Sequence, residues 1–207
     1  MSVLIVAEHD NAGLKPSTLN TVTAAAQLGG DVAMLIAGSD CAGASAAAAK
    51  VPGIGKLLVA DSAEYGASLA ENPAPLIGKL APRSSHIRAP ASTFGKNVNL
   101  SAAALLDVQQ ISDISGIEGP DTFVRPIYAG NAMATVKSGD KIKILTVRTT
   151  AFDAAPEDGG SAATESVEAT GDTGLASFVG QELTKSERPE LTTAGIVISG
   201  GRGMQSG

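Results

Sequence analysis

The chain has 207 residues, which is long enough for one well-buried domain with some remainder. Its 15 basic and 21 acidic residues give a net charge of -6 and only 3% of the residues are aromatic, so a nucleic-acid surface is not expected. A single cysteine excludes an internal disulfide, and no apolar run approaches the ~20 residues of a membrane span, so we expect a soluble protein of a reducing compartment without membrane insertion.

The first half of the chain alternates short apolar runs with segments suited to helices, which predicts a doubly wound α/β fold with a mostly parallel sheet. The chain enters its first predicted strand directly, without a targeting segment. Ser17 is the expected N-cap of the first helix. We expect strands over residues 3–7, 32–37, 56–60, 85–89 and 111–114, and helices over 18–28, 41–50, 73–80 and 98–107.

The spacing of the turns changes after residue 120. Residues 122–128, 132–137 and 141–148 are joined by tight turns rich in Gly, Asn and Asp, which predicts an added three-stranded antiparallel meander. Residues 152–174 are acidic, small and rich in Ser, Thr and Ala, as is typical of a mobile loop. Residues 175–183 are expected to form a last helix.

The C-terminal stretch differs from the rest of the chain. Residues 184–190 are charged and contain a proline, as expected of a linker between domains. Residues 196–198 predict a buried parallel strand that runs into the glycine-rich loop 199–203, where bare backbone and Arg202 would suit an anionic cofactor group. The motif is weak on its own, because Ser206 stands where a dinucleotide fingerprint has its third glycine, and a polar Gly-rich tail is the alternative.

Side chains that could carry chemistry are few. Glu8, His9 and Asp10 follow the first strand at the carboxyl end of the sheet, but no second histidine lies at ligand spacing, so we interpret them as a polar loop and expect no metal site. Residues 92–97 suit either a phosphate or a helix cap, and they lack P-loop spacing. His86 is interpreted as a packed or edge histidine. Without a nucleophile elbow, no catalytic residue is expected.

Several runs resemble the α subunit of electron transfer flavoproteins, and they extend along the whole chain. The matching runs are residues 5–9, 19–21 with 28–30, 94–97, 111–114, 120–132, 152–155, 188–191 and 199–203. The resemblance implies that residues 1–188 form the N-terminal α/β domain and that residues 189–207 start a second, Rossmann-like domain that holds FAD mostly through residues outside this sequence. It also implies that Arg202 and Gly203 bind the flavin, where a fixed guanidinium would stabilise the charge that reduction creates.

The resemblance further implies an electron carrier without catalytic turnover of its own. In that family the α subunit forms a heterodimer with a β subunit that holds AMP, and electrons pass from acyl-CoA and related dehydrogenases of fatty acid oxidation to a membrane quinone oxidoreductase. Its location would be the bacterial cytoplasm, or the mitochondrial matrix of a eukaryote. Two alternatives stay open: an adenine-nucleotide module that uses residues 8–16 and 92–97, and a structural module that docks a β subunit through residues 122–148.

Overall fold

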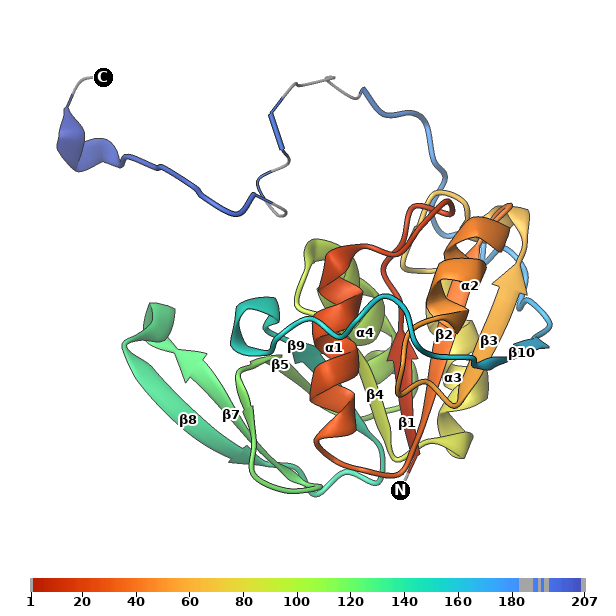
Figure 1. The fold of residues 1–207 in the computed structure, drawn as a ribbon, viewed down its shortest axis with the longest axis horizontal. Coiled ribbons are helices and arrows are strands. Elements are labelled where there is room, and N and C mark those ends of the chain that lie inside the picture. The colour runs from red at the N-terminus through yellow and green to blue at the C-terminus, as the bar shows by residue number, and fades with distance from the viewer. Residues whose placement is uncertain (1, 183–187, 190, 192–193, 206–207) are drawn as a thin grey trace.

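The computed structural model describes residues 2–182, 188–189, 191 and 194–205. Seven strands form the central sheet in the order β10-β3-β2-β1-β4-β9-β5, and every neighbouring pair is parallel (Figure 1). They are β1 (Ser2–Val6), β2 (Asp31–Gly38), β3 (Lys56–Asp61), β4 (His86–Pro90), β5 (Gln110–Ile114), β9 (Lys143–Val147) and β10 (Ala163–Ser166). Because β1 pairs with β2 on one side and β4 on the other, the strand order reverses beside β1, where open α/β sheets bind ligands.

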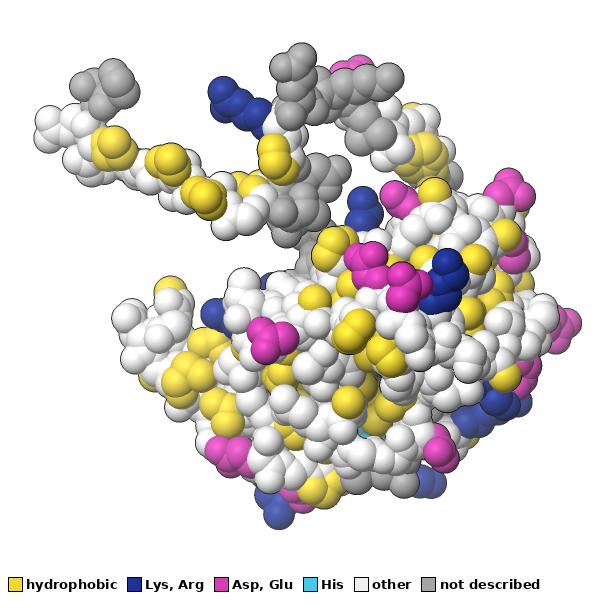
Figure 2. Space-filling view, in the orientation of Figure 1, with side chains coloured by type: hydrophobic (Ala, Val, Ile, Leu, Met, Phe, Trp, Pro, Cys, Tyr) yellow, Lys and Arg dark blue, Asp and Glu magenta, His cyan; other side chains and the backbone are white. Residues whose placement is uncertain are grey.

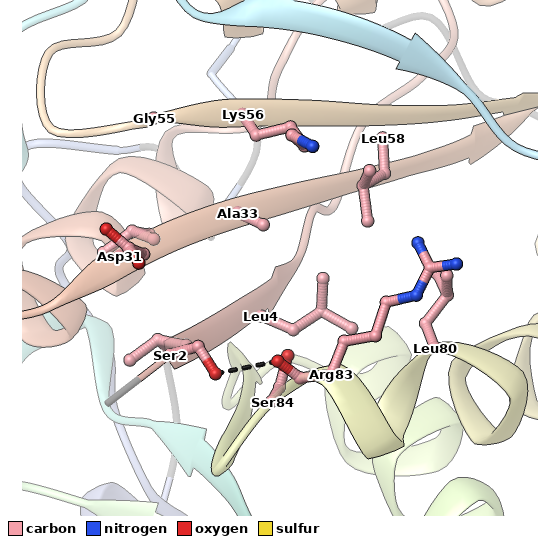
Figure 3. Close-up of a pocket in the computed structure, with 12 residues that line it drawn as sticks. Ser2, Leu4, Asp31, Ala33, Gly55, Lys56, Leu58, Leu80, Arg83 and Ser84 are labelled. Atoms are coloured by element: carbon pink, nitrogen blue, oxygen red, sulfur yellow. Dashed lines mark hydrogen bonds between the residues drawn. The ribbon is translucent and has the colours of Figure 1, made fainter.

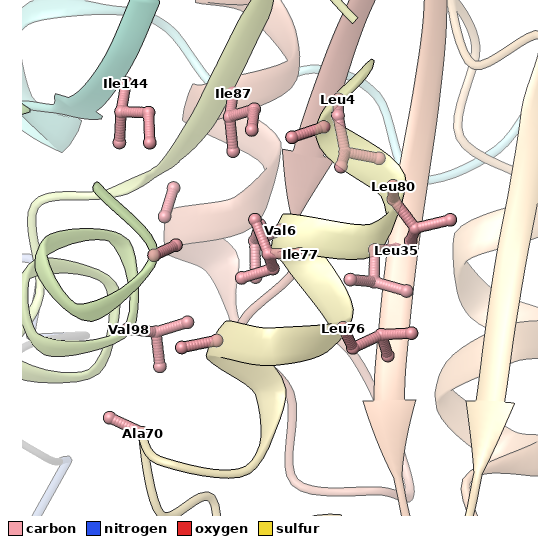
Figure 4. Close-up of a cluster of buried hydrophobic side chains, with 14 of the residues drawn as sticks. Leu4, Val6, Leu35, Ala70, Leu76, Ile77, Leu80, Ile87, Val98 and Ile144 are labelled. Atoms are coloured by element: carbon pink, nitrogen blue, oxygen red, sulfur yellow. The ribbon is translucent and has the colours of Figure 1, made fainter. Parts of the chain in front are cut away.

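Two layers of helices bury the sheet on both faces. The helices α1 (Pro16–Ala26) and α2 (Ala42–Ala49) cover one face, and α3 (Pro73–Leu80) and α4 (Thr93–Leu105) cover the other (Figure 1). Successive strand residues face opposite sides, so Val3 and Ile5 pack under α1 and α2 while Leu4 packs under α3 (Figure 4). This arrangement confirms the predicted doubly wound α/β fold.

A second, antiparallel sheet of three strands stands beside the main one. It contains β6 (Gly116–Ile117), β7 (Thr122–Ile127) and β8 (Ala132–Lys137). The prediction of an added antiparallel meander is confirmed, but its third strand was wrong. Residues 141–148 supply β9, which lies between β4 and β5 in the parallel sheet, because Ile144 and Leu145 face opposite sides, are both fully buried and need cover on both faces.

Residues 152–174, which the composition predicts as a mobile loop, are partly ordered against the domain. The backbone N–H of Ala155 donates to a carbonyl of α1 (3.2 Å), and that of Gly160 donates to the carbonyl of Lys50 after α2 (2.7 Å). Residues Ala163–Ser166 then form β10 along the outer edge of β3. The prediction was wrong because these contacts are made by backbone groups, which the acidic, small-residue composition does not reveal.

Two helices start at other residues than predicted. Helix α1 starts at Pro16, a residue favoured in the first turn, so Ser17 is not the N-cap; its hydroxyl donates to a Glu8 carboxylate oxygen instead (3.0 Å). Helix α4 starts at Thr93, five residues before the predicted start. Ser92 is its N-cap and accepts a hydrogen bond from the Gly95 N–H (3.1 Å), which supports the cap interpretation of this segment.

The predictions for residues 175–198 were wrong or fall on residues outside the described ones. Residues 175–182 form no helix, residue 183 lies outside the described residues, and the predicted linker at 184–190 lies mostly outside them. Residues 196–198 are not a buried strand, since Ile196 and Ile198 are 86% and 96% exposed. A strand needs a sheet to complete its hydrogen bonds, and no described residue after Ala169 joins the three hydrophobic clusters.

Candidate functional site

The loop after β1 packs over the carboxyl end of β2 and the start of α2. The side-chain oxygen of Asn11 accepts a hydrogen bond from the Ser39 N–H (3.2 Å), and its backbone carbonyl accepts one from the Ala44 N–H in α2 (3.0 Å). The Asp61 carboxylate accepts two more from the N–H groups of Asp40 (2.8 Å) and Cys41 (3.2 Å). Donors that could otherwise meet a phosphate at the start of α2 are therefore taken by the chain itself.

Contacts around Gly38, the last residue of β2, show how closely this loop packs. A Cβ atom at this position would lie 2.3 Å from Asn11 Oδ1 and 2.8 Å from both His9 Cε1 and Cys41 Cβ. A second glycine, Gly43, is as restricted, because its Cβ would lie 2.4 Å from a backbone carbonyl of the same loop. The loop after β1 therefore packs tightly against the end of β2 and the start of α2.

Both histidines have structural surroundings. His9 Nδ1 accepts a hydrogen bond from the Asn11 N–H (3.2 Å), and burial lowers the pKa of His9 below its usual value. His86 is 2% exposed; its Nε2 donates to the Pro120 carbonyl (2.6 Å) and its ring meets Phe123 edge to face, with centroids 6.2 Å apart. Burial lowers the pKa of His86 as well. The interpretation of His86 as a packed histidine is confirmed.

Neither a metal cluster nor a membrane-spanning helix occurs in the part of the chain that the structure describes. No three side chains of His, Cys, Asp or Glu gather there to hold an ion. None of the helices described is both long and apolar enough to cross a bilayer. Cys41 is fully buried at the start of α2, and burial raises the pKa of its thiol.

The hairpin of β7 and β8 presents a second candidate surface. At its tip Tyr128, Ala129 and Gly130 follow one another with φ of 49°, 53° and 91°, a conformation that costs energy for residues other than glycine. The hairpin buries Phe123 against the domain and turns its other face outward, where Tyr128 is 79% and Met133 59% exposed. Figure 2 shows hydrophobic side chains gathered over this hairpin. We call Tyr128 and Met133 the hairpin surface.

The glycine-rich loop near the C-terminus carries Arg202 and Gly203 on an exposed 3₁₀ turn, Arg202–Met204. The Arg202 guanidinium has no hydrogen bond or ion pair with any residue that the structure describes. A Cβ atom at Gly201 or Gly203 would meet nothing within 4 Å, so no described neighbour requires glycine there. A permanent cation beside bare backbone fits an anionic ring or phosphate, and these residues would supply one edge of its site.

Sequence reasoning did not single out Asn11, which holds the loop after β1 against the end of β2. Asn11 adopts φ of 69°, and asparagine tolerates this left-handed conformation better than most residues. The polar run after β1 therefore indicated a turn, but nothing in it indicated that the turn would fold onto β2. Conversely, the structure does not bring Arg202 and Gly203 together with the loops at residues 8–16 and 92–97 by any hydrogen bond among the described residues.

The fold defines a class: a doubly wound α/β domain of nucleotide-binding architecture. A family model described as the electron transfer flavoprotein domain matches residues 3–172. The chain is 58% identical over 207 residues to the electron transfer flavoprotein subunit alpha of Pseudomonas aeruginosa, and 57% identical over 206 residues to that of Bradyrhizobium diazoefficiens. The chain belongs to the electron transfer flavoprotein family.

A mitochondrial relative extends the comparison to eukaryotes. The electron transfer flavoprotein subunit alpha of Dictyostelium discoideum is 48% identical over 221 residues. These three alignments cover 100%, 100% and 99% of this chain but 67%, 65% and 62% of the relatives. The chain therefore spans about two thirds of the length of the relatives that it matches. All three are named as subunits of an electron carrier and not as enzymes.

Proposed function

We propose that the chain serves as the α subunit of a heterodimeric electron transfer flavoprotein, an electron carrier with no catalytic turnover of its own. In this proposal residues 1–188 are the N-terminal α/β domain and residues 189–207 start the FAD-binding domain. The observation that carries the proposal is the 58% identity to a subunit of this name along the whole chain.

FAD would supply the redox chemistry by taking up and releasing electrons. Arg202 would lie against the flavin ring and hold a fixed positive charge there, which favours the reduced, more negative form. Gly203 would let the backbone approach the ring, consistent with the open space around the position where its Cβ would stand. The exposed guanidinium and bare glycines support this assignment.

The partners follow from the same proposal. The carrier would accept electrons from acyl-CoA and related dehydrogenases of fatty acid oxidation and deliver them to a membrane quinone oxidoreductase. The β subunit would hold AMP in a domain of the same architecture. We propose a location in the bacterial cytoplasm, or in the mitochondrial matrix of a eukaryote.

We further propose that the β subunit docks on the hairpin surface. Large apolar side chains that stay exposed on a strained turn are typical of a protein interface, where aromatic residues and methionine are enriched. Tyr128 combines an exposed aromatic ring with a left-handed backbone, which makes it the expected anchor.

Coexpression with a β subunit tests this arrangement. We expect a one-to-one heterodimer in size exclusion, and a Tyr128→Ser, Met133→Ser double variant should weaken its affinity by about 2 kcal/mol or more, since central interface anchors contribute that much. The matched control is Leu100→Ser with Leu105→Ser on α4, because these side chains are also exposed, at 58% and 62%. Equal loss of affinity for the β subunit in both double variants, or no loss in either, would contradict the proposal that the hairpin surface forms the interface.

A further inference from the structure

A cavity of about 380 Å³ lies at the opposite edge of the sheet, at the amino ends of β1, β2 and β3 (Figure 3). Leu4, Ala33 and Lys56 are neighbours in one row across these three strands. The cavity exists because Ala33 is small and because α3 ends at Leu80, so neither fills the space above this row. Its volume falls in the range of ~300–1,000 Å³ in which proteins bind small molecules.

The cavity has an apolar floor and a cationic rim. Leu4, Leu58 and Leu80 lie around the same space, and Lys56 and Arg83 stand at its edge (Figure 3). The one acidic residue among its lining residues, Asp31, lies at the end away from Arg83. A ligand with an apolar body and one negative group therefore matches the lining.

The protein already holds a carboxylate between the two cations. Glu165 on β10 is the register neighbour of Leu58, and its carboxylate lies 2.9 Å from Lys56 Nζ and 3.7 Å from Arg83 Nη1. The hydrogen bond from Lys56 keeps the pKa of Glu165 below its usual value, so this group is an anion at neutral pH. All three side chains are at least 42% exposed, so a ligand can reach them from solvent.

We propose that this cavity binds a small amphipathic carboxylate. The apolar body lies on Leu4, Leu58 and Leu80, and the carboxylate takes the place of Glu165 between Lys56 and Arg83. The site lies away from the loop after β1, the hairpin surface and Arg202, so it goes beyond the proposed function and does not rest on it. It also connects ligand binding to the edge strand β10, which carries Glu165.

Three probes of one shape test the proposal by titration calorimetry on the full chain: 4-phenylbutanoate, the neutral 4-phenylbutan-1-ol and the cationic 4-phenylbutylammonium. We expect the carboxylate to bind at least fivefold more tightly than the alcohol, and the ammonium to bind more weakly than both, because only the carboxylate forms charge-assisted hydrogen bonds at the rim. Saturation-transfer NMR should show the phenyl ring against leucine methyl groups. Equal affinity for all three probes would overturn the proposal.

Four variants locate the site. Ala33→Leu should fill the cavity and abolish binding of the carboxylate, while Arg83→Gln should remove its advantage over the alcohol. Glu165→Gln should tighten carboxylate binding about threefold or more, because it frees both cations. The matched control is Lys79→Gln, which removes the same charge from α3 at a residue outside this cavity and should change nothing. Circular dichroism and the melting temperature establish that each variant folds.

The result that contradicts the proposal is also specific. If folded Ala33→Leu binds 4-phenylbutanoate as the parent does, the ligand lies elsewhere. If Lys79→Gln weakens binding as much as Arg83→Gln, the affinity reflects net charge and not this site. If Glu165→Gln weakens binding, the carboxylate does not take the place of Glu165.

Discussion

Arg88 lies in the middle of β4 with its side chain fully buried. One guanidinium nitrogen, Nη1, donates to the carbonyl of Ala24 in α1 (2.5 Å), while Nε and Nη2 have no hydrogen-bond partner. Burial lowers the pKa of Arg88 to about 10, so the side chain is still charged at neutral pH. A buried cation with two donors unsatisfied costs stability.

Replacing this arginine should therefore stabilise the domain. We expect Arg88→Met to raise the free energy of unfolding by about 1–3 kcal/mol, because methionine is unbranched, of similar reach and needs no partner. Urea unfolding followed by circular dichroism measures the change. A loss of similar size would mean that a buried anion or water satisfies the two donors and that Arg88 is stabilising as it stands.

The two histidines predict a pH dependence. Burial lowers both pKa values in the folded chain, so the unfolded chain, with an ordinary histidine pKa near ~6.5, binds more protons as pH falls below that value. Stability from the neutral histidines is thus complete above about pH 6.5 and is lost progressively below it. We expect the melting temperature to fall by a few degrees from pH 7.5 to 5.5.

A double variant isolates this effect, since His9 and His86 are the only histidines of the chain. The double variant His9→Asn, His86→Gln should have a melting temperature that changes little with pH across this range, whatever its absolute value. If the slope of the double variant equals that of the parent, other groups cause the pH dependence.

What the sequence revealed at this scale depended on the kind of residue. A permanent cation in a glycine-rich loop, Arg202, can be recognised from its neighbours in the chain. Arg88 cannot, because it stands in a run that predicts a strand and only the packing of α1 shows that no solvent reaches it. The hydrogen bond between Asn11 and Ser39 joins two loops, and no pattern in either loop indicates the other.

Among the elements, α4 shows how a helix is placed by one small residue. A Cβ atom at Gly95, in its first turn, would lie 2.0 Å from the carbonyl oxygen of Pro90 at the end of β4. The helix therefore rests directly on the backbone of the strand that precedes it. In contrast, Gly78 in α3 has nothing within 4 Å of the same position.

These two helical glycines make a matched pair. Gly95→Ala should destabilise the domain by about 2 kcal/mol or more, because the clash is with backbone that cannot move aside. Gly78→Ala should stabilise it by about 0.5–1 kcal/mol, the difference in helix propensity. Chemical unfolding of both variants is the measurement. Equal effects would show that α4 can shift from β4 and that the close contact is not required.

At the element scale, periodicity predicted the first five strands and the existence of all four major helices. It failed where position depends on distant partners. Strand β9 follows two tight turns, which predicts a meander, yet its buried Ile144 and Leu145, on opposite faces, place it inside the parallel sheet. Strand β10 has no apolar signature, because it is an exposed edge strand held by backbone pairing with β3.

For the whole molecule, the fold has a nucleotide-binding architecture in which the loop after β1 packs on the end of β2 through Asn11 and its neighbours. Such a domain can still position other parts of a complex, and its exposed features fit that role: the hairpin surface and the turn that carries Arg202. The sequence indicated the turn through its glycines, and it indicated the family through runs spread over the chain. It could not indicate that the loop after β1 packs on the end of β2, since that depends on how loops pack.

The measurement that tests this account most directly is the midpoint potential of FAD in the heterodimer of a β subunit with the subunit that carries this sequence. We predict that Arg202→Ala lowers the potential of the one-electron couple by about 60–130 mV. For one electron this is equivalent to the roughly 1.5–3 kcal/mol of a hydrogen bond to a charged group. The potential of Arg202→Lys should lie between those of the parent and Arg202→Ala. Arg83→Gln, near the cavity at the amino ends of the strands, should have the potential of the parent. An unchanged potential in Arg202→Ala, with FAD bound in full, would contradict the placement of this cation beside the flavin.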